Sequence, residues 1–189
     1  MHTAKLAQLE SSKASSLWRD AAVVLLSSFL IGLFAKLAIP LPFTPVPIGT
    51  QNFVVLFLAA LLGPRKGAAA VFAFLAQGAL GWPVFAGGVG GAAKLLGPTG
   101  GYLIGYLVAA YVTGALVEKA KEATAAKIFW ALSAGAAVIY AFGASYLALF
   151  VGIEKAFLLG VAPFLLGDAF KAVFCVKILN WVSGLNKRA

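Results

Sequence analysis

The chain of 189 residues is 62% apolar and only 11% charged, with a net charge of +9. A soluble domain of this length cannot bury so much apolar surface, so the composition excludes an ordinary soluble enzyme, a disordered chain and a disulfide scaffold, and indicates an integral membrane protein. Because His2 is the only histidine and Cys175 the only cysteine, we expect no histidine-based catalytic triad, no multi-histidine metal site and no internal disulfide.

Six apolar segments follow one another along the chain after a polar start. Residues 1–16 predict a tail, either a mobile end or a helix on the membrane surface. The run 17–39 is long enough to cross a bilayer, and no small-x-small cleavage site follows it, which favours a transmembrane helix over a signal peptide. Five more runs complete the prediction of an all-α membrane domain of six transmembrane helices over 17–182, followed by a cytoplasmic tail over 183–189. These runs are 51–62, 67–81, 101–117, 126–151 and 162–182.

Lysine and arginine are distributed unevenly along these segments. Eleven of them fall in segments that the six-helix topology places on the side of both termini, whereas the loops on the other side hold only Lys94 and Lys155. The positive-inside rule therefore predicts cytoplasmic termini and outward-facing loops. Since topology explains the charge, no nucleic-acid partner is expected.

Two outer loops have unusual compositions. The loop 39–49 has four prolines and no charge, and the loop 82–100 has six glycines, two prolines and one charge. Irregular backbone at membrane depth persists only where it is buried in protein or lines a cavity. The loops either cap a pocket or simply pack on the helix ends, and their length favours a cap over a pocket that opens outward.

Two charged residues lie within the last predicted helix. Asp168 and Lys171 are three residues apart, so their side chains share one face of the helix. A charge near the middle of a membrane costs about 2.5–3.5 kcal/mol, and such residues are usually functional or paired. Ligand contact and a structural ion pair remain equally good interpretations.

Other polar and aromatic side chains are expected at the same outer level. Together they predict a pocket for a small ligand with a few polar groups and apolar walls, although a polar residue at a helix end is also often a cap or an interhelical hydrogen bond. The candidates are Thr44, Gln51, Gln77, Trp82, Phe85 and Tyr102. On the first helix, Ser28 and Gly32 form a small-xxx-small pair, which suits either a docking face for a partner or internal packing.

Four stretches of the chain form recognisable motifs: PFTPVPIGTQ at 42–51, GWPVFAGG at 81–88, LGPTGGYLIG at 96–105 and PFLLGDAFK at 163–171. They resemble the BioY family, the biotin-capturing S components of energy-coupling factor (ECF) transporters. The resemblance covers nearly all of residues 17–182. It implies an S-component bundle with an outward biotin pocket capped by loops, and no enzyme activity or cofactor. The implied partners are biotin, membrane lipid, a membrane coupling subunit (the T component) and ATPase subunits.

By the motif match, Asp168 and Lys171 would take the polar ends of biotin, and the Gln51 region and the loop that contains Lys94 would complete the site. Biotin offers two ureido N–H donors, a carbonyl, an apolar thiophane ring and a carboxylate, which a carboxylate and a cation of the protein can match. Which lysine meets which end of biotin stays open at this stage.

Several other functions compete with biotin capture. The nearest are an S component for another vitamin and a biotin-related secondary transporter that works alone. A channel is disfavoured by the apolar inner halves of the helices, and an intramembrane enzyme by the lack of a nucleophile with a base. The glycine-rich run 87–91 is no phosphate loop, since no Gly-Lys-Ser/Thr follows it.

Overall fold

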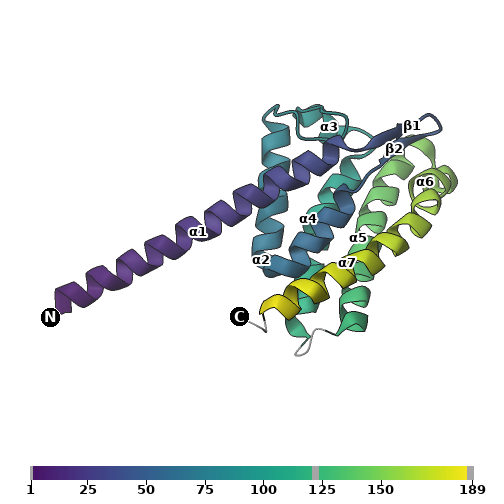
Figure 1. Ribbon diagram of the computed structural model, residues 1–189. Coiled ribbons are helices and arrows are strands. Elements are labelled where there is room, and N and C mark those ends of the chain that lie inside the picture. The colour runs from purple at the N-terminus through teal and green to yellow at the C-terminus, as the bar shows by residue number, and fades with distance from the viewer. Residues whose placement is uncertain (1, 121–123, 187–189) are drawn as a thin grey trace.

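The computed structural model describes residues 2–120 and 124–186, which form a bundle of long helices with short elements gathered at one end (Figure 1). Within those ranges, five helical segments are long and apolar enough to cross a membrane. The long helices are α1 (His2–Lys36), α2 (Gln51–Ala79), α4 (Gly100–Lys119), α5 (Ala125–Val151) and α7 (Leu165–Asn186). This architecture confirms a multi-pass membrane protein.

Helix α2 consists of two helices that meet at a sharp turn. Gly63 has a non-helical backbone with φ 81° and ψ 175°, and it is followed by Pro64. A positive φ is readily adopted only by glycine, and proline cannot donate the next helical hydrogen bond. The two halves then pack closely against each other. A Cβ added to Gly67 in the second half would lie only 2.8 Å from the Cα of Ala59 in the first half. The halves correspond to the second and third predicted helices, so the six-helix bundle is confirmed.

The last span is divided, which the sequence did not predict. Helix α5 ends at Gly152, where φ is 84°, and the eight-residue helix α6 (Ile153–Gly160) follows. A 3-10 turn, η1 (Ala162–Phe164), then leads into α7. Pro163 lies near the start of this turn, where its missing N–H costs no helical hydrogen bond.

The loops at one end of the bundle contain three more short elements, so the all-α class gains a small β-hairpin. Strand β1 (Ile39–Leu41) pairs antiparallel with β2 (Thr44–Ile48), and α3 (Ala92–Leu96) lies in the second loop. Because both strands are edges of a two-stranded sheet, their prolines remove no central ladder hydrogen bond. The hairpin, α3 and α6 gather at the same end of the bundle (Figure 1).

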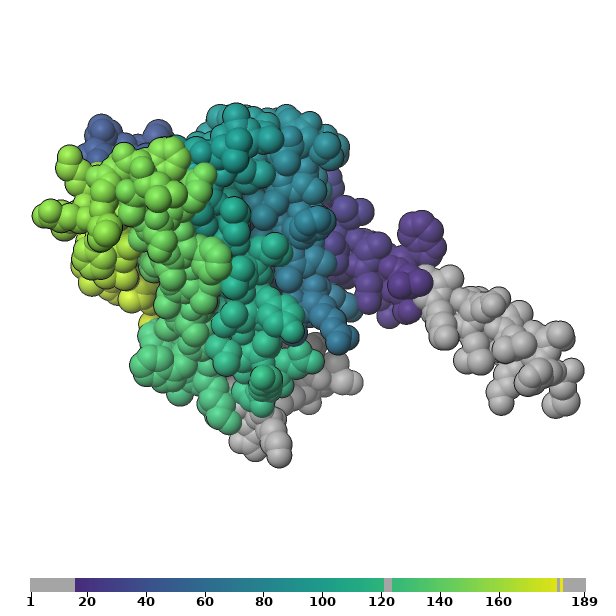
Figure 2. Space-filling model, turned by 180° about the vertical axis from the view of Figure 1, so that it is seen from behind, coloured from purple at the N-terminus to yellow at the C-terminus, as the bar shows by residue number. Residues whose placement is uncertain are grey.

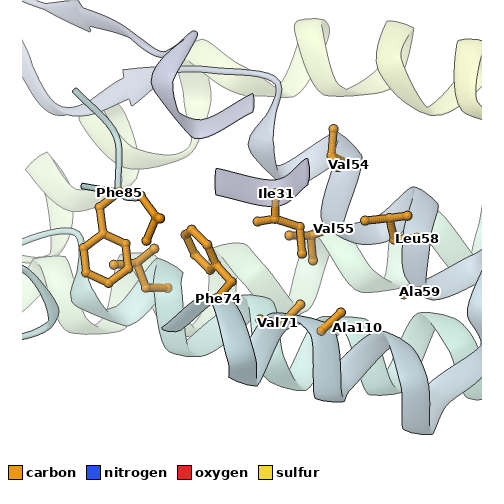
Figure 3. Packing of buried hydrophobic residues seen from close by; sticks show 12 residues of the cluster. Ile31, Val54, Val55, Leu58, Ala59, Val71, Phe74, Phe85 and Ala110 are labelled. Atoms are coloured by element: carbon orange, nitrogen blue, oxygen red, sulfur yellow. The ribbon is translucent and has the colours of Figure 1, made fainter. Parts of the chain in front are cut away.

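Helix α1 leans away from the other helices. It is continuous through residue 17, where the sequence places the start of the membrane domain. Its described side chains project from one side of the body (purple in Figure 2), with Trp18, Leu26 and Leu33 largely exposed. Large apolar side chains in this position suit contact with lipid. Where α1 does pack, Ile31 inserts between Val55 and Phe74, which come from the two halves of α2 (Figure 3).

The α2 turn is held by close packing against α4. A Cβ added to Gly114 would lie 2.5 Å from the nitrogen of Pro64 and 2.6 Å from the carbonyl carbon of Gly63. Since backbone cannot move aside as a flexible side chain can, Gly114→Val is expected to lower the free energy of unfolding by about 1–3 kcal/mol. Thermal unfolding in detergent measures the change.

The matched control is Gly167→Ala in α7, where an added Cβ meets nothing within 4 Å. Alanine favours a helix more than glycine does, so this variant is expected to unfold at the same temperature or slightly higher. Equal stability of the two variants would contradict the close packing of the turn.

Candidate ligand-binding site

A cavity of about 80 Å³ lies beneath the loops, at the end of the bundle where the hairpin and α3 meet the long helices. This volume has room for several waters or part of a small ligand. The start of α2, the loop that follows α2, and the first turns of α4 and α7 all reach it. Its polar lining residues are Gln51, Asn52, Lys94, Thr99, Tyr102, Tyr106, Tyr140, Asp168 and Lys171.

Asp168 is the centre of a hydrogen-bonded cluster at one wall of this cavity. Its Oδ1 lies 2.9 Å from Nζ of Lys171, the pair that their spacing along α7 predicts. Its Oδ2 accepts hydrogen bonds from Nδ2 of Asn52 at 2.7 Å and from the hydroxyl of Tyr140 at 2.5 Å. The Asp168 side chain is only 11% exposed, so three donors compensate for the loss of water around its charge.

Lys171 also joins the proline-rich hairpin to α7 by a hydrogen bond. Its ammonium donates to the carbonyl oxygen of Gly49 at 2.8 Å, just after β2, and approaches Oδ1 of Asn52 at 3.5 Å. The prolines near Gly49 have no backbone N–H to donate, so nearby carbonyl oxygens lack backbone partners. The ammonium of Lys171 supplies a donor to one of these oxygens. The positive charge of Lys171 is therefore balanced by Asp168 and its donors are already largely engaged.

Three other donors at the cavity have no partner among the described residues. Nε2 of Gln51 is buried and makes no hydrogen bond. No hydrogen bond or ion pair involves Lys94 or the hydroxyl of Tyr106 in the part of the chain that the structure describes, although both residues line the cavity. Buried polar groups are nearly always satisfied, so the unpaired amide of Gln51 indicates a ligand that accepts from it. Lys94 and Tyr106 are half-buried, and both can donate to the same ligand.

Aromatic rings form the apolar walls. Phe85 is fully buried and meets Phe74 edge to face, with 5.5 Å between ring centroids (Figure 3). The absence of a side chain at Gly78 leaves the space that the ring of Phe85 occupies. On the other side, Tyr102 donates to the carbonyl oxygen of Gly160 at 2.8 Å and so joins α4 to the end of α6. The cavity thus combines a neutralised ion pair, an unpaired cation and an apolar middle.

Three of the sequence candidates do not line this cavity. The hydroxyl of Thr44 donates to the carbonyl oxygen of Leu159 at 2.8 Å, which ties β2 to α6, and Thr44 lines a neighbouring pocket. Gln77 turns toward α1 and donates to Ser28 at 2.9 Å. Trp82 is 49% exposed and lies against Phe29. The other candidates, Gln51, Phe85, Lys94, Tyr102, Asp168 and Lys171, all reach the cavity.

The two small residues of the docking face predicted on the first helix are both buried in this structure. Ser28 is fully buried, and its hydroxyl donates to the carbonyl oxygen of Leu25 while accepting from Gln77. A Cβ added to Gly32 would lie 3.2 Å from Cβ of Val84 in the second outer loop. These small residues let α1 approach α2 and that loop, which is the internal packing that the sequence offered as one alternative; a docking role for them stays a prediction.

Sequence reasoning did not include three cavity residues in the site. Asn52 stands beside Gln51, and only the structure shows that its amide bonds Asp168. Tyr106 lies one turn after Tyr102, and an i, i+4 tyrosine pair on one helix face was a usable signal. Tyr140 is a hydroxyl within the long apolar helix α5, which also marks a site where a polar partner is needed.

Comparisons with known proteins agree with this picture. The sequence profile of the BioY family matches residues 5–187. The chain is 39% identical over 160 residues to the probable biotin transporter BioY of Pyrococcus horikoshii, covering 82% of this chain and 94% of that one. It is 43% identical over 144 residues to the biotin transporter BioY of Thermotoga maritima, covering 74% and 82%.

A solved structure has the same fold. It is the crystal structure of an S-component for biotin from an ECF-type ABC transporter, and it matches with a TM-score of 0.82 at 31% identity. The match covers 90% of this chain and 93% of that one, so the likeness extends over most of the fold.

Proposed function

Because this chain belongs to the BioY family, we propose that it captures biotin in the cavity beneath its loops and serves as the S component of an ECF-type transporter in biotin uptake. The relatives are transporters, and this chain is a transport protein of the membrane and not an enzyme. The observation that carries the assignment to a ligand site is the convergence of Asp168, Lys171 and Lys94 on one cavity.

The cluster around Asp168 suits the ureido ring of biotin. Oδ2 of Asp168 already accepts two hydrogen bonds, whereas Oδ1 accepts only one, from Lys171. A carboxylate oxygen has two lone-pair sites, so Oδ1 retains one for a ureido N–H group. The unpaired amide of Gln51 is a suitable donor to the ureido carbonyl oxygen. The ureido end therefore lies toward α7 in this proposal.

Lys94 is the better partner for the carboxylate of biotin. Lys171 is neutralised by Asp168 and donates to Gly49, so a second anion beside it would gain little and would repel Asp168. Lys94 lines the cavity from α3 with no anionic partner among the described residues. An unpaired cation at the edge of an apolar cavity gains most from binding an anion. This assignment selects between the alternatives that the sequence left open.

Calorimetry with biotin and with its alcohol analogue, biotinol, tests both contacts. Native protein is expected to bind biotin more tightly than biotinol, whereas Lys94→Met is expected to bind the two equally. Asp168→Asn is expected to weaken both ligands by a similar factor. Losing one partner of a buried charged hydrogen bond typically costs about 2–5 kcal/mol, so each loss should be about thirtyfold or more.

Lys155→Met is the matched control, since Lys155 is also a cation of the outer end but is exposed and lines no cavity described here. It should bind both ligands as the native protein does. Undetectable biotin binding by the folded native protein would refute the proposed function. Unchanged discrimination against biotinol in Lys94→Met would refute the assignment of the carboxylate.

Uptake needs partners that supply energy. The sequence has no nucleotide-binding motif, and its buried ion pair is assigned to the ligand. The related S-component comes from an ECF-type ABC transporter, which supports a membrane coupling subunit and ATPase subunits as partners. In liposomes the chain alone is expected to bind biotin without accumulating it. Accumulation by the chain alone under an imposed ion gradient would identify a secondary transporter instead.

The cavity faces outward and both termini are cytoplasmic in this proposal. Support comes from Arg65 and Lys66 at the α2 turn and Lys119 at the end of α4, which lie together at the end of the bundle opposite the cavity. Cations concentrate on the cytoplasmic side of membrane proteins. Helix α7 also ends at the same end of the bundle as the α2 turn (Figure 1), which supports a cytoplasmic C-terminus.

Labelling of intact cells checks this orientation. In a Cys175→Ser background, a membrane-impermeant maleimide is expected to label Lys94→Cys and to leave Lys66→Cys unlabelled until the cells are opened. The reverse pattern would show that the cavity faces the cytoplasm.

A further inference from the structure

A second cavity of about 250 Å³ lies between α5, α7 and the first half of α2. It is lined largely by small or apolar side chains, with Ser133, Ala136 and Ala137 on α5 facing Ala169 and Ala172 on α7. Their positions follow the i, i+3, i+4 spacing of single helix faces. Since small residues line both facing helices, the two helices leave a space that no side chain fills.

The two cavities share four lining residues, Asn52, Tyr140, Asp168 and Lys171. These are the same residues that form the hydrogen-bonded cluster around the Asp168 carboxylate. The cluster thus borders both the loop-capped cavity and this second, lateral cavity. Its four side chains form the layer that the two cavities share.

Tyr140 differs from the other members of this layer. It is the only ring among them, and it comes from α5, whereas Asp168 and Lys171 come from α7. Its hydroxyl and the amide of Asn52 both bind Oδ2, so together they determine that Oδ1 is the carboxylate oxygen with a free lone pair.

We propose that Tyr140 is a positioning residue that holds the Asp168 carboxylate in its ligand-binding orientation and whose ring closes the biotin cavity against the lateral cavity. The first role rests on the proposed function, since it concerns the bound ligand. The second concerns the protein alone. The two roles are separable, because Tyr140→Phe removes the hydroxyl and keeps the ring, whereas Tyr140→Ala removes both.

Affinity for biotin tests the positioning role. Hydrogen bonds to a charged group contribute more than neutral ones, so Tyr140→Phe is expected to weaken biotin binding by roughly tenfold or more. Tyr146→Phe is the matched control, because Tyr146 is on the same helix and its hydroxyl donates instead to the carbonyl oxygen of Leu96. Native affinity in Tyr140→Phe would overturn the positioning role.

The single cysteine tests the closing role, since Cys175 lines the lateral cavity and not the loop-capped one. A negatively charged methanethiosulfonate added outside proteoliposomes cannot cross the lipid, so it reaches Cys175 only through the biotin cavity. Native protein and Tyr140→Phe are expected to stay unlabelled. Tyr140→Ala is expected to label at least tenfold faster, and excess biotin is expected to slow this labelling.

Phe129→Ala is the control for this measurement, because Phe129 is on the same helix and lines only the lateral cavity. It enlarges that cavity without breaching the layer and should stay unlabelled. Equal labelling of Phe129→Ala and Tyr140→Ala would overturn the closing role. So would an absence of labelling in folded Tyr140→Ala, provided that the same variant labels fully once it is unfolded in detergent. Should Tyr140→Ala not fold, Tyr140→Leu replaces it, with the same expectation of faster labelling because the ring is lost. Labelling in the absence of biotin does not depend on ligand binding. It therefore tests the closing role even if the native protein does not bind biotin.

Discussion

A buried carboxylate at membrane depth is the constraint on which the site depends. Asp168 cannot remain charged there without partners, and its partners come from three separate helices: Lys171 from α7, Asn52 from α2 and Tyr140 from α5. Satisfying one charge therefore requires these helices to meet at one level. The same meeting point brings Gly49 and the proline-rich hairpin onto Lys171, so the cap and the cavity wall are built by one cluster.

The turn inside α2 makes that convergence possible. A helix of 29 residues without a break would carry its two ends to opposite faces of the membrane. The break at Gly63 and Pro64 instead returns the chain, so that Gln51 at the start of α2 and Phe85 just after its end line the same cavity. The turn packs directly against Gly114 on α4, where a side chain would collide with its backbone. Backbone geometry at the α2 turn thus determines which residues meet at the opposite end of the bundle.

The two lysines of the cavity differ in whether they have a partner. In the proposed function, this difference decides which end of the ligand each lysine meets. Lys171 is neutralised and engaged before any ligand arrives, whereas Lys94 and the amide of Gln51 have no partner among the described residues. The Asp168–Lys171 pair offers a preformed acceptor and donor to a polar ring, and Lys94 offers a cation to an anion. A ligand with one polar uncharged end and one carboxylate is matched at both ends without exposing a charge to the apolar middle.

Composition and local pattern determined much of this protein. The apolar fraction and the length of the apolar runs indicated a membrane bundle, the cations predicted its orientation, and the spacing of Asp168 and Lys171 placed them on one helix face. These properties depend on neighbours along the chain. Only the tertiary structure decided that Asn52 and Tyr140 complete the Asp168 cluster, from positions 116 and 28 residues away. It also decided that Ser28 and Gly32 face inward and that Thr44, Gln77 and Trp82 lie outside the cavity. The physical reason is that the rotation of each helix about its axis is set by packing against the others, and that packing is a property of the assembled bundle.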